Sequence, residues 1–153
     1  MDVVFDSAAA EKVVARSLEL VGRGDDLVTV VAIDSGADYI RGVLATATNA
    51  NGPFQMDRSL TAREFAAMAM RVGADMPEIP RDWKARQPTT VYDAPALTGA
   101  AILVCMPADN TIVGVVALIG LQSAHAYGIL REAVADGGFA FITSDAPTTG
   151  ADV

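Results

Sequence analysis

The alternation of apolar and polar positions in the second half of the chain predicts two strands followed by a helix. Residues 100–106 and 112–121 are almost entirely apolar, and residues 107–110 (Pro-Ala-Asp-Asn) separate them with residue types that favour tight turns. An amphipathic segment follows at residues 123–135, before two consecutive glycines. This pattern predicts a β-hairpin that leads directly into a helix.

The first half of the chain predicts a helix and then a second hairpin. Ser7 is expected to cap a helix whose buried stripe recurs every three or four residues until Gly22 ends it. Residues 27–33 are a nearly unbroken apolar run, which is typical of a central strand covered on both faces. After a turn at Gly36, residues 39–48 are expected to pair with this strand. The stripe of the helix consists of Ala10, Val13, Val14, Ser17, Leu18 and Val21.

Between the two hairpins, the sequence Thr61-Ala62-Arg63-Glu64 has the spacing of a capping box. In that motif the hydroxyl and the carboxylate each accept a hydrogen bond from a free amide at a helix start. We therefore expect a helix from Thr61 to Val72, ended by Gly73. The side chains expected to be buried are Phe65, Met68, Ala69 and Val72.

Two segments lack such periodicity. Residues 74–95 contain four prolines and predict an extended loop on the surface, long enough to serve as a lid or an arm that contacts a partner. Residues 139–143 are long enough for one added edge strand, and residues 144–153 are expected to be a tail. The chain is thus predicted to be one domain, residues 1–143, with a C-terminal tail.

The predicted order is helix, hairpin, helix, long loop, hairpin, helix and a possible extra strand. Because hairpins make a sheet antiparallel, the fold class is α+β, not a doubly wound parallel sheet. The first and last helices can share one face of that sheet in a two- or three-layer sandwich. Profilin-like, roadblock-like and GAF-like domains use variants of this plan.

Composition and charge exclude several classes of function. The chain of 153 residues is 52% hydrophobic, which is too apolar for a disordered protein, and its net charge of −8 argues against nucleic-acid binding and against anionic membrane surfaces. No apolar run approaches the length of a membrane-spanning helix, and the acidic start is unlike a secretory signal. This start therefore leads us to expect a cytoplasmic protein. The single cysteine cannot form an internal disulfide.

Few residues can carry chemistry. His125 could ligate a haem iron or act as a general base, and it could equally be a helix residue that faces solvent or an interface. Cys105 lies in an apolar run, where a thiol usually behaves as a small buried hydrophobe. Tyr127 and Asp34 complete the set of candidate ligand-binding residues. Asp34 and Asp38 flank a turn, but the further oxygen ligands of a calcium loop are missing, so no metal site is predicted. No catalytic residue is predicted either.

The glycines at positions 114 and 120 lie where a strand passes into a helix, an arrangement also found in phosphate-binding loops. Neither a Gly-rich phosphate motif nor a Walker lysine accompanies them. Close packing of the backbone is therefore the preferred explanation for Gly114 and Gly120.

Arg81, Lys84 and Arg86 surround Trp83 in the long loop and form a basic and aromatic cluster. Such a cluster could recognise a carboxylate or a phosphate, or it could contact an acidic neighbouring subunit. We favour the neighbouring subunit, with Trp83, Arg81 and Arg86 as interface residues, because tryptophan and arginine are typical anchors of protein interfaces.

Four features together resemble the GlcG/HbpS family: an N-terminal helix, residues 30–36 (Val-Val-Ala-Ile-Asp-Ser-Gly), Met56-Asp57 before a helix, and residues 111–120 (Thr-Ile-Val-Gly-Val-Val-Ala-Leu-Ile-Gly) before the last helix. The likeness covers most of residues 7–135. It implies a small oligomeric domain, and some members are linked to haem or corrinoid binding. Gly36 stands where the family has paired glycines, and Gln122-Ser123 replaces its acidic pair, so no ligand residue is carried over.

Two functions follow as hypotheses. The first is a non-enzymatic, sensor-like domain that binds a small molecule and forms a homo-oligomer, with haem or a corrinoid implied only by the resemblance. The second is a structural subunit, for example of a bacterial or phage particle, in which residues 74–95 and the C-terminal tail contact neighbouring copies. An enzyme is the weaker hypothesis, because no paired-residue signature supports it.

Overall fold

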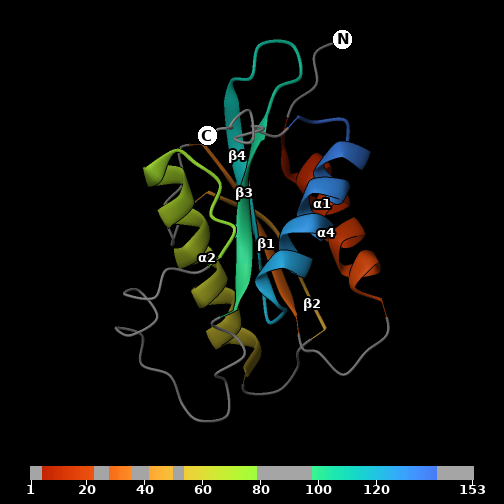
Figure 1. Cartoon of the computed structure of the whole chain (residues 1–153), viewed down its shortest axis with the longest axis vertical. Helices are drawn as coiled ribbons and strands as arrows, with labels where there is room; N and C mark the ends of the chain where they lie inside the picture. Colours follow the sequence, from red (N-terminus) through yellow and green to blue (C-terminus); the bar gives the residue numbers. More distant parts are fainter. Residues whose placement is uncertain (1–4, 23–27, 36–41, 50–53, 79–97, 141–153) are drawn as a thin grey trace.

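An antiparallel sheet of four strands forms the middle layer of the molecule, with helices on both faces (Figure 1). The computed structural model describes residues 5–22, 28–35, 42–49, 54–78 and 98–140. The strand order is β2-β1-β4-β3. The elements are α1 (Ser7–Val21), β1 (Thr29–Asp34), β2 (Val43–Thr48), α2 (Phe54–Val72), β3 (Gly99–Cys105), β4 (Ile112–Ile119) and α4 (Ser123–Asp136).

The predicted α+β class and element order are confirmed, and the sandwich has three layers. Helices α1 and α4 lie side by side on one face of the sheet, and α2 covers the other (Figure 1). Side chains of β1 alternate between these two layers: Val30 and Ala32 pack towards α1 and α4, whereas Val31 and Ile33 pack towards α2. This double coverage is why the central strands are continuous apolar runs.

Helix α1 begins at Ser7, so Ser7 is inside the helix and is not its N-cap. Asp6 is the N-cap, and its carboxylate accepts a hydrogen bond from the Ala9 amide at 2.9 Å. The expectation for Ser7 was wrong because Ser7 is already the first helical residue, and Asp6 is an equally good capping residue. At the other end, Gly22 adopts a φ of 76°, which favours glycine.

Helix α2 begins at Phe54, so the capping box predicted at Thr61 is wrong. Thr61 lies seven residues after the start of α2, where the backbone amides already donate to carbonyls of the preceding turn. No free amide is left for the Thr61 hydroxyl or the Glu64 carboxylate to cap. The predicted end at Val72 is correct, and Gly73 follows with a φ of 74°. Among the helices that the structure describes, α2 is the longest, and none of them is long and apolar enough to cross a bilayer.

The buried stripe of α2 differs in part from the prediction. Phe65 and Ala69 are fully buried, as expected, but Met68 is only half-buried and Val72 is 61% exposed. Val72 lies in the last turn, beyond the part of α2 that packs on the sheet. The side chains of α2 that form the core on this face are Ala62, Phe65, Ala66, Ala67 and Ala69.

The outer edge of β3 is closed by segments from two distant parts of the chain. The main chains of Met76 and Ala101 exchange two hydrogen bonds of 2.8 Å, and those of Ala140 and Cys105 exchange two of 2.8 and 2.9 Å. Between them, an Asp75 carboxylate oxygen accepts from the Leu103 amide at 2.9 Å. The predicted edge strand at 139–143 is a single bridge at Ala140, and residues 141–143 lie outside the described part.

Close approach of the backbone explains Gly114, as predicted. A Cβ at this position would lie 2.5 Å from the Ile33 carbonyl oxygen and 2.6 Å from the Phe5 ring. The Phe5 ring also packs edge-on against Phe139, with ring centroids 5.1 Å apart. Gly114 therefore allows the N-terminal segment to cover this end of the sheet.

The β3–β4 turn is stabilised by an aspartate. The Asp109 carboxylate accepts a hydrogen bond from the Thr111 amide at 3.0 Å, and this bond lowers the pKa of Asp109 below its ordinary value. Asn110 takes a φ of 59°, which asparagine tolerates better than most residues. The turn predicted from Pro-Ala-Asp-Asn is thus present, with both polar residues in specific roles.

Candidate functional site

An open groove of about 400 Å³ lies between α1 and α4 on the outer side of that layer. Helix α4 supplies most of its wall, and α1 contributes Leu20. The wall is mainly apolar, with one imidazole and one carboxylate. Its lining residues are Leu20, Ala124, His125, Gly128, Ile129 and Glu132.

His125, the only histidine of the chain, lies in this groove. It is the third residue of α4, and its side chain is exposed, so the imidazole is accessible to a ligand. Glu132 follows on the same helix about two turns later, at the other end of the lining. A spacing of seven residues places the two side chains roughly 10 Å apart along the axis, too far to share one metal ion.

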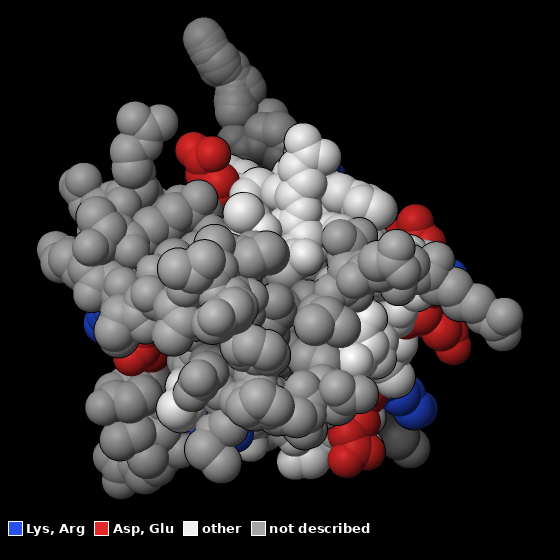
Figure 2. All heavy atoms as spheres, turned by 90° about the horizontal axis from the view of Figure 1, so that it is seen from below, with Lys and Arg blue, Asp and Glu red and all other residues white. Residues whose placement is uncertain are grey.

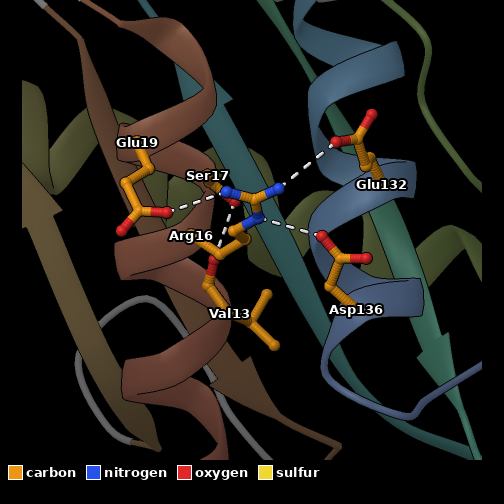
Figure 3. Close-up of polar contacts among 6 residues, drawn as sticks. All are labelled: Val13, Arg16, Ser17, Glu19, Glu132 and Asp136. Carbon is orange, nitrogen blue, oxygen red and sulfur yellow. Dashed lines mark hydrogen bonds and ion pairs between the residues drawn. The ribbon is translucent and has the colours of Figure 1, made fainter.

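Next to the groove, Arg16 of α1 contacts three carboxylates: Glu19 on its own helix, and Glu132 and Asp136 on α4 (Figure 3). Its guanidinium lies 2.8 Å from Glu19, 2.9 Å from Asp136 and 3.6 Å from Glu132. The hydrogen bonds to Asp136 and Glu19 raise the pKa of Arg16 above its ordinary value. Arg16 is therefore already engaged by anionic groups of the protein and offers little positive charge to a ligand.

Tyr127 points away from the groove and towards the edge of β3. Its hydroxyl donates to the second carboxylate oxygen of Asp75 at 3.0 Å, and the Arg131 guanidinium lies 5.6 Å from the centre of its ring. Asp75 therefore links α4 to the main chain of β3, where it also accepts from Leu103. Asp75 is not among the residues predicted from the sequence, because 52 positions separate it from Tyr127 and no local pattern marks the contact.

The structure does not bring the predicted ligand-binding residues together. Asp34 is half-buried at the last position of β1, where its amide donates to the Gly42 carbonyl at 3.0 Å and its register partner is Gly114. Helix α4 begins shortly after Ile119, the partner of Thr29 at the other end of β1. His125 and Asp34 thus lie at opposite ends of the sheet.

Cys105 is buried in β3, as expected, and lies near the β3–β4 turn. It is therefore also at the other end of the sheet from the start of α4, and a catalytic pair with His125 is not formed. Within the described residues, no three His, Cys, Asp or Glu side chains are placed to hold a metal ion.

Trp83, Arg81, Arg86 and Asp38 lie outside the described residues, as do most of the arm at 74–95 and the whole tail at 144–153. The interface predicted for the basic and aromatic cluster therefore stays a prediction. The described start of that arm, residues 74–78, includes Asp75 and Met76, two of the three residues that close the edge of β3.

Comparison with solved structures adds a fold relationship. A crystal structure of HbpS superposes with a TM-score of 0.58 at 19% identity, covering 89% of this chain and 92% of that chain. A double mutant of HbpS from Streptomyces reticuli gives the same TM-score at 18% identity and covers 89% and 88%. This chain has an HbpS-like fold. No family model matches the sequence, and no curated protein does.

The HbpS-like fold confirms the structural part of the resemblance seen in the sequence. Both comparisons extend over nearly the whole of each chain, so the likeness includes both hairpins and is not confined to one motif. At this identity the likeness to HbpS concerns the fold.

Proposed function

We propose that the chain is a non-enzymatic, sensor-like domain that binds a small molecule in the groove between α1 and α4 and works as a homo-oligomer. The observation that carries this proposal is the position of the only imidazole, exposed in an open and mostly apolar groove of an HbpS-like fold. Small-molecule sites commonly combine such apolar walls with a few polar groups.

The lining favours a ligand of a particular chemistry. Leu20 and Ile129 supply apolar contact area, and Ala124 and Gly128 leave room beside them. His125 supplies a hydrogen bond or a metal-coordinating nitrogen. Glu132 carries a negative charge at the end of the groove. These groups favour a ligand that has an apolar surface, carries a metal or polar group able to bind the His125 imidazole, and has no negative charge of its own.

Haem, or a corrinoid, meets these requirements only in part. His125 is suited to ligate the central metal of either group, and the apolar side chains are suited to the face of a flat ring. The carboxylates of haem find no lysine or arginine among the lining residues, and the nearby Arg16 is held by three carboxylates. The groove therefore fits the metal-bearing part of haem and not its charged edge.

A pair of matched probes tests the proposal. Hemin and its dimethyl ester share the iron and the ring, but the ester lacks the two negative charges. We expect saturable binding of both, with a shifted Soret band. The affinity is expected to be about tenfold higher for the ester, because it is not repelled by the Glu132 carboxylate of the groove. His125→Ala is expected to abolish the Soret shift, whereas Lys12→Ala, an exposed change on α1 away from the groove, leaves it intact.

Two results would contradict the proposal: no saturable binding of either probe, or a His125→Ala variant that binds both as the wild type does. Native mass spectrometry of the protein from its expression host provides a second readout, because it reports the number of copies and any small molecule that co-purifies.

A further inference from the structure

We propose that two copies of this chain associate through the β2 edge of the sheet, centred on Thr46, forming one continuous antiparallel sheet. The inference rests on the homo-oligomer named in the proposed function and specifies the surface that would form it. It starts from a difference between the two edges of the sheet, which end in β3 and β2.

The β3 edge is closed to a further strand. Its outward main-chain groups at Ala101 and Cys105 pair with Met76 and Ala140, and the outward amide of Leu103 pairs with the Asp75 carboxylate. Natural sheets commonly protect an edge in this way, because unpaired amides and carbonyls otherwise act as a template for another chain.

The β2 edge presents its main chain outward at Thr46. The Asn49 amide donates inward to the Val28 carbonyl at 3.2 Å, and in an antiparallel pair the inward positions alternate. Residues 45 and 47 therefore face β1, and Thr46 faces away from it. Within the described part of the chain, no residue forms a hydrogen bond to the outward main chain of Thr46, and its side chain is exposed.

The absence of charged side chains on β2 favours a second copy of this acidic chain at this edge. Each chain has a net charge of −8, so two copies repel wherever their carboxylates meet. Among the described residues visible in Figure 2, red carboxylates are more extensive than blue cationic side chains. Strand β2, Val-Leu-Ala-Thr-Ala-Thr, contains no charged residue and no proline, which are the usual protections of an exposed edge.

A two-fold axis at Thr46 makes the edge complementary to itself. The amide and carbonyl of Thr46 in each copy then pair with those of Thr46 in the other, and the two side chains lie directly opposite one another. Threonine is well suited to such a cross-strand pair, because it is β-branched and can form a hydrogen bond to another threonine.

The test uses the full chain and the molar mass measured by light scattering over a range of concentrations. Thr46→Pro removes the outward amide, and proline is tolerated on an edge strand when its amide position faces solvent. Because the axis repeats the change, two hydrogen bonds are lost, and the dissociation constant of the dimer is expected to rise about thirtyfold. Thr46→Val keeps the amide and the β-branched shape and removes only the hydroxyl, so the dissociation constant is expected to rise much less than in Thr46→Pro.

Thr46→Lys provides a second test if the proline variant does not fold by circular dichroism. It places two ammonium groups opposite each other at the axis, so self-association is expected to weaken at low salt and to recover at high salt. An effect of net charge alone would act in the opposite direction, because the substitution makes each copy less acidic. The variant therefore separates contact at Thr46 from general repulsion.

The outcomes distinguish this inference from the proposed function. A wild type that stays monomeric overturns both the edge contact and the homo-oligomer, whatever the hemin titration gives. An oligomer that survives in folded Thr46→Pro and in Thr46→Lys at low salt overturns the β2 contact alone. Loss of hemin binding in His125→Ala, with an unchanged molar mass, concerns the groove and not this edge.

Discussion

At the residue scale, glycines show how the same residue type serves different ends. Gly114 is required by close packing, because the Ile33 carbonyl and the Phe5 ring occupy the space that a Cβ would need. Gly128 lies in the middle of α4, where an added Cβ would meet no atom within 4 Å apart from the adjacent backbone of its own helix. The sequence predicted close packing at Gly114 from the absence of a phosphate motif, but it contained no sign that Gly128 borders a groove.

Gly114→Ala and Gly128→Ala therefore form a matched pair. We expect Gly114→Ala to lower the free energy of unfolding by about 1–3 kcal/mol, because the main chain of Ile33 must move to admit the methyl group. Gly128→Ala is expected to raise it by about 0.5–1 kcal/mol, since alanine has the better helix propensity and meets no steric obstacle. Urea denaturation of both variants measures the two effects, and similar destabilisation by both would contradict this account.

At the element scale, a polar contact joins the segment after α2 to the side of α4 at the edge of β3. Asp75 accepts from the Leu103 amide with one carboxylate oxygen and from the Tyr127 hydroxyl with the other. The sequence predicted β3, β4 and α4 nearly in full, because their apolar runs and terminal glycines are strong local signals. It did not predict this contact, because the partners come from segments that only the folded sheet brings together.

We expect Tyr127→Phe to cost about 1–2 kcal/mol of unfolding free energy, and Asp75→Ala about 2–3 kcal/mol, because the second change also leaves the Leu103 amide unpaired. In the Asp75→Ala background, the further change Tyr127→Phe should cost little, since its acceptor is already gone. Urea denaturation of the four proteins gives this cycle. Faster hydrogen exchange of the Leu103 amide in Asp75→Ala, but not in Tyr127→Phe, would locate the effect at the strand edge.

At the scale of the whole molecule, the sheet divides the interior into two separate cores. Leu130 of α4 belongs to the core beneath α1 and α4, and Ile33 of β1 faces the core beneath α2. Each core is closed by its own helices, and the side chains of one strand alternate between them. Changes on opposite faces should therefore act independently.

Leu130→Ala is expected to cost about 2–5 kcal/mol of unfolding free energy, and Ile33→Val about 0.5–1.5 kcal/mol. The double variant should equal the sum of the two to within about 0.5 kcal/mol, because the sheet separates the two cavities. Thermal and urea denaturation of the three variants provide the measurement. A double variant that departs from the sum by more than about 1 kcal/mol would indicate that the two cores respond as one unit.

The sequence alone determined the order of the strands and helices and the approximate position of most of them, that the sheet is antiparallel, and that the strand at residues 27–33 is covered on both faces. These properties follow from apolar periodicity and from short hairpin connections, which act over a few residues. The helix start predicted from the capping spacing at Thr61 was wrong, because Thr61 lies inside α2, where the backbone amides are already paired. Only the tertiary structure decided that His125 borders a groove, that Tyr127 turns to Asp75, and that β3 is closed while Thr46 faces outward on β2. Those facts depend on which surfaces meet when distant segments pack, and hydrophobic burial selects the packing without leaving a local mark on the polar residues that it brings together.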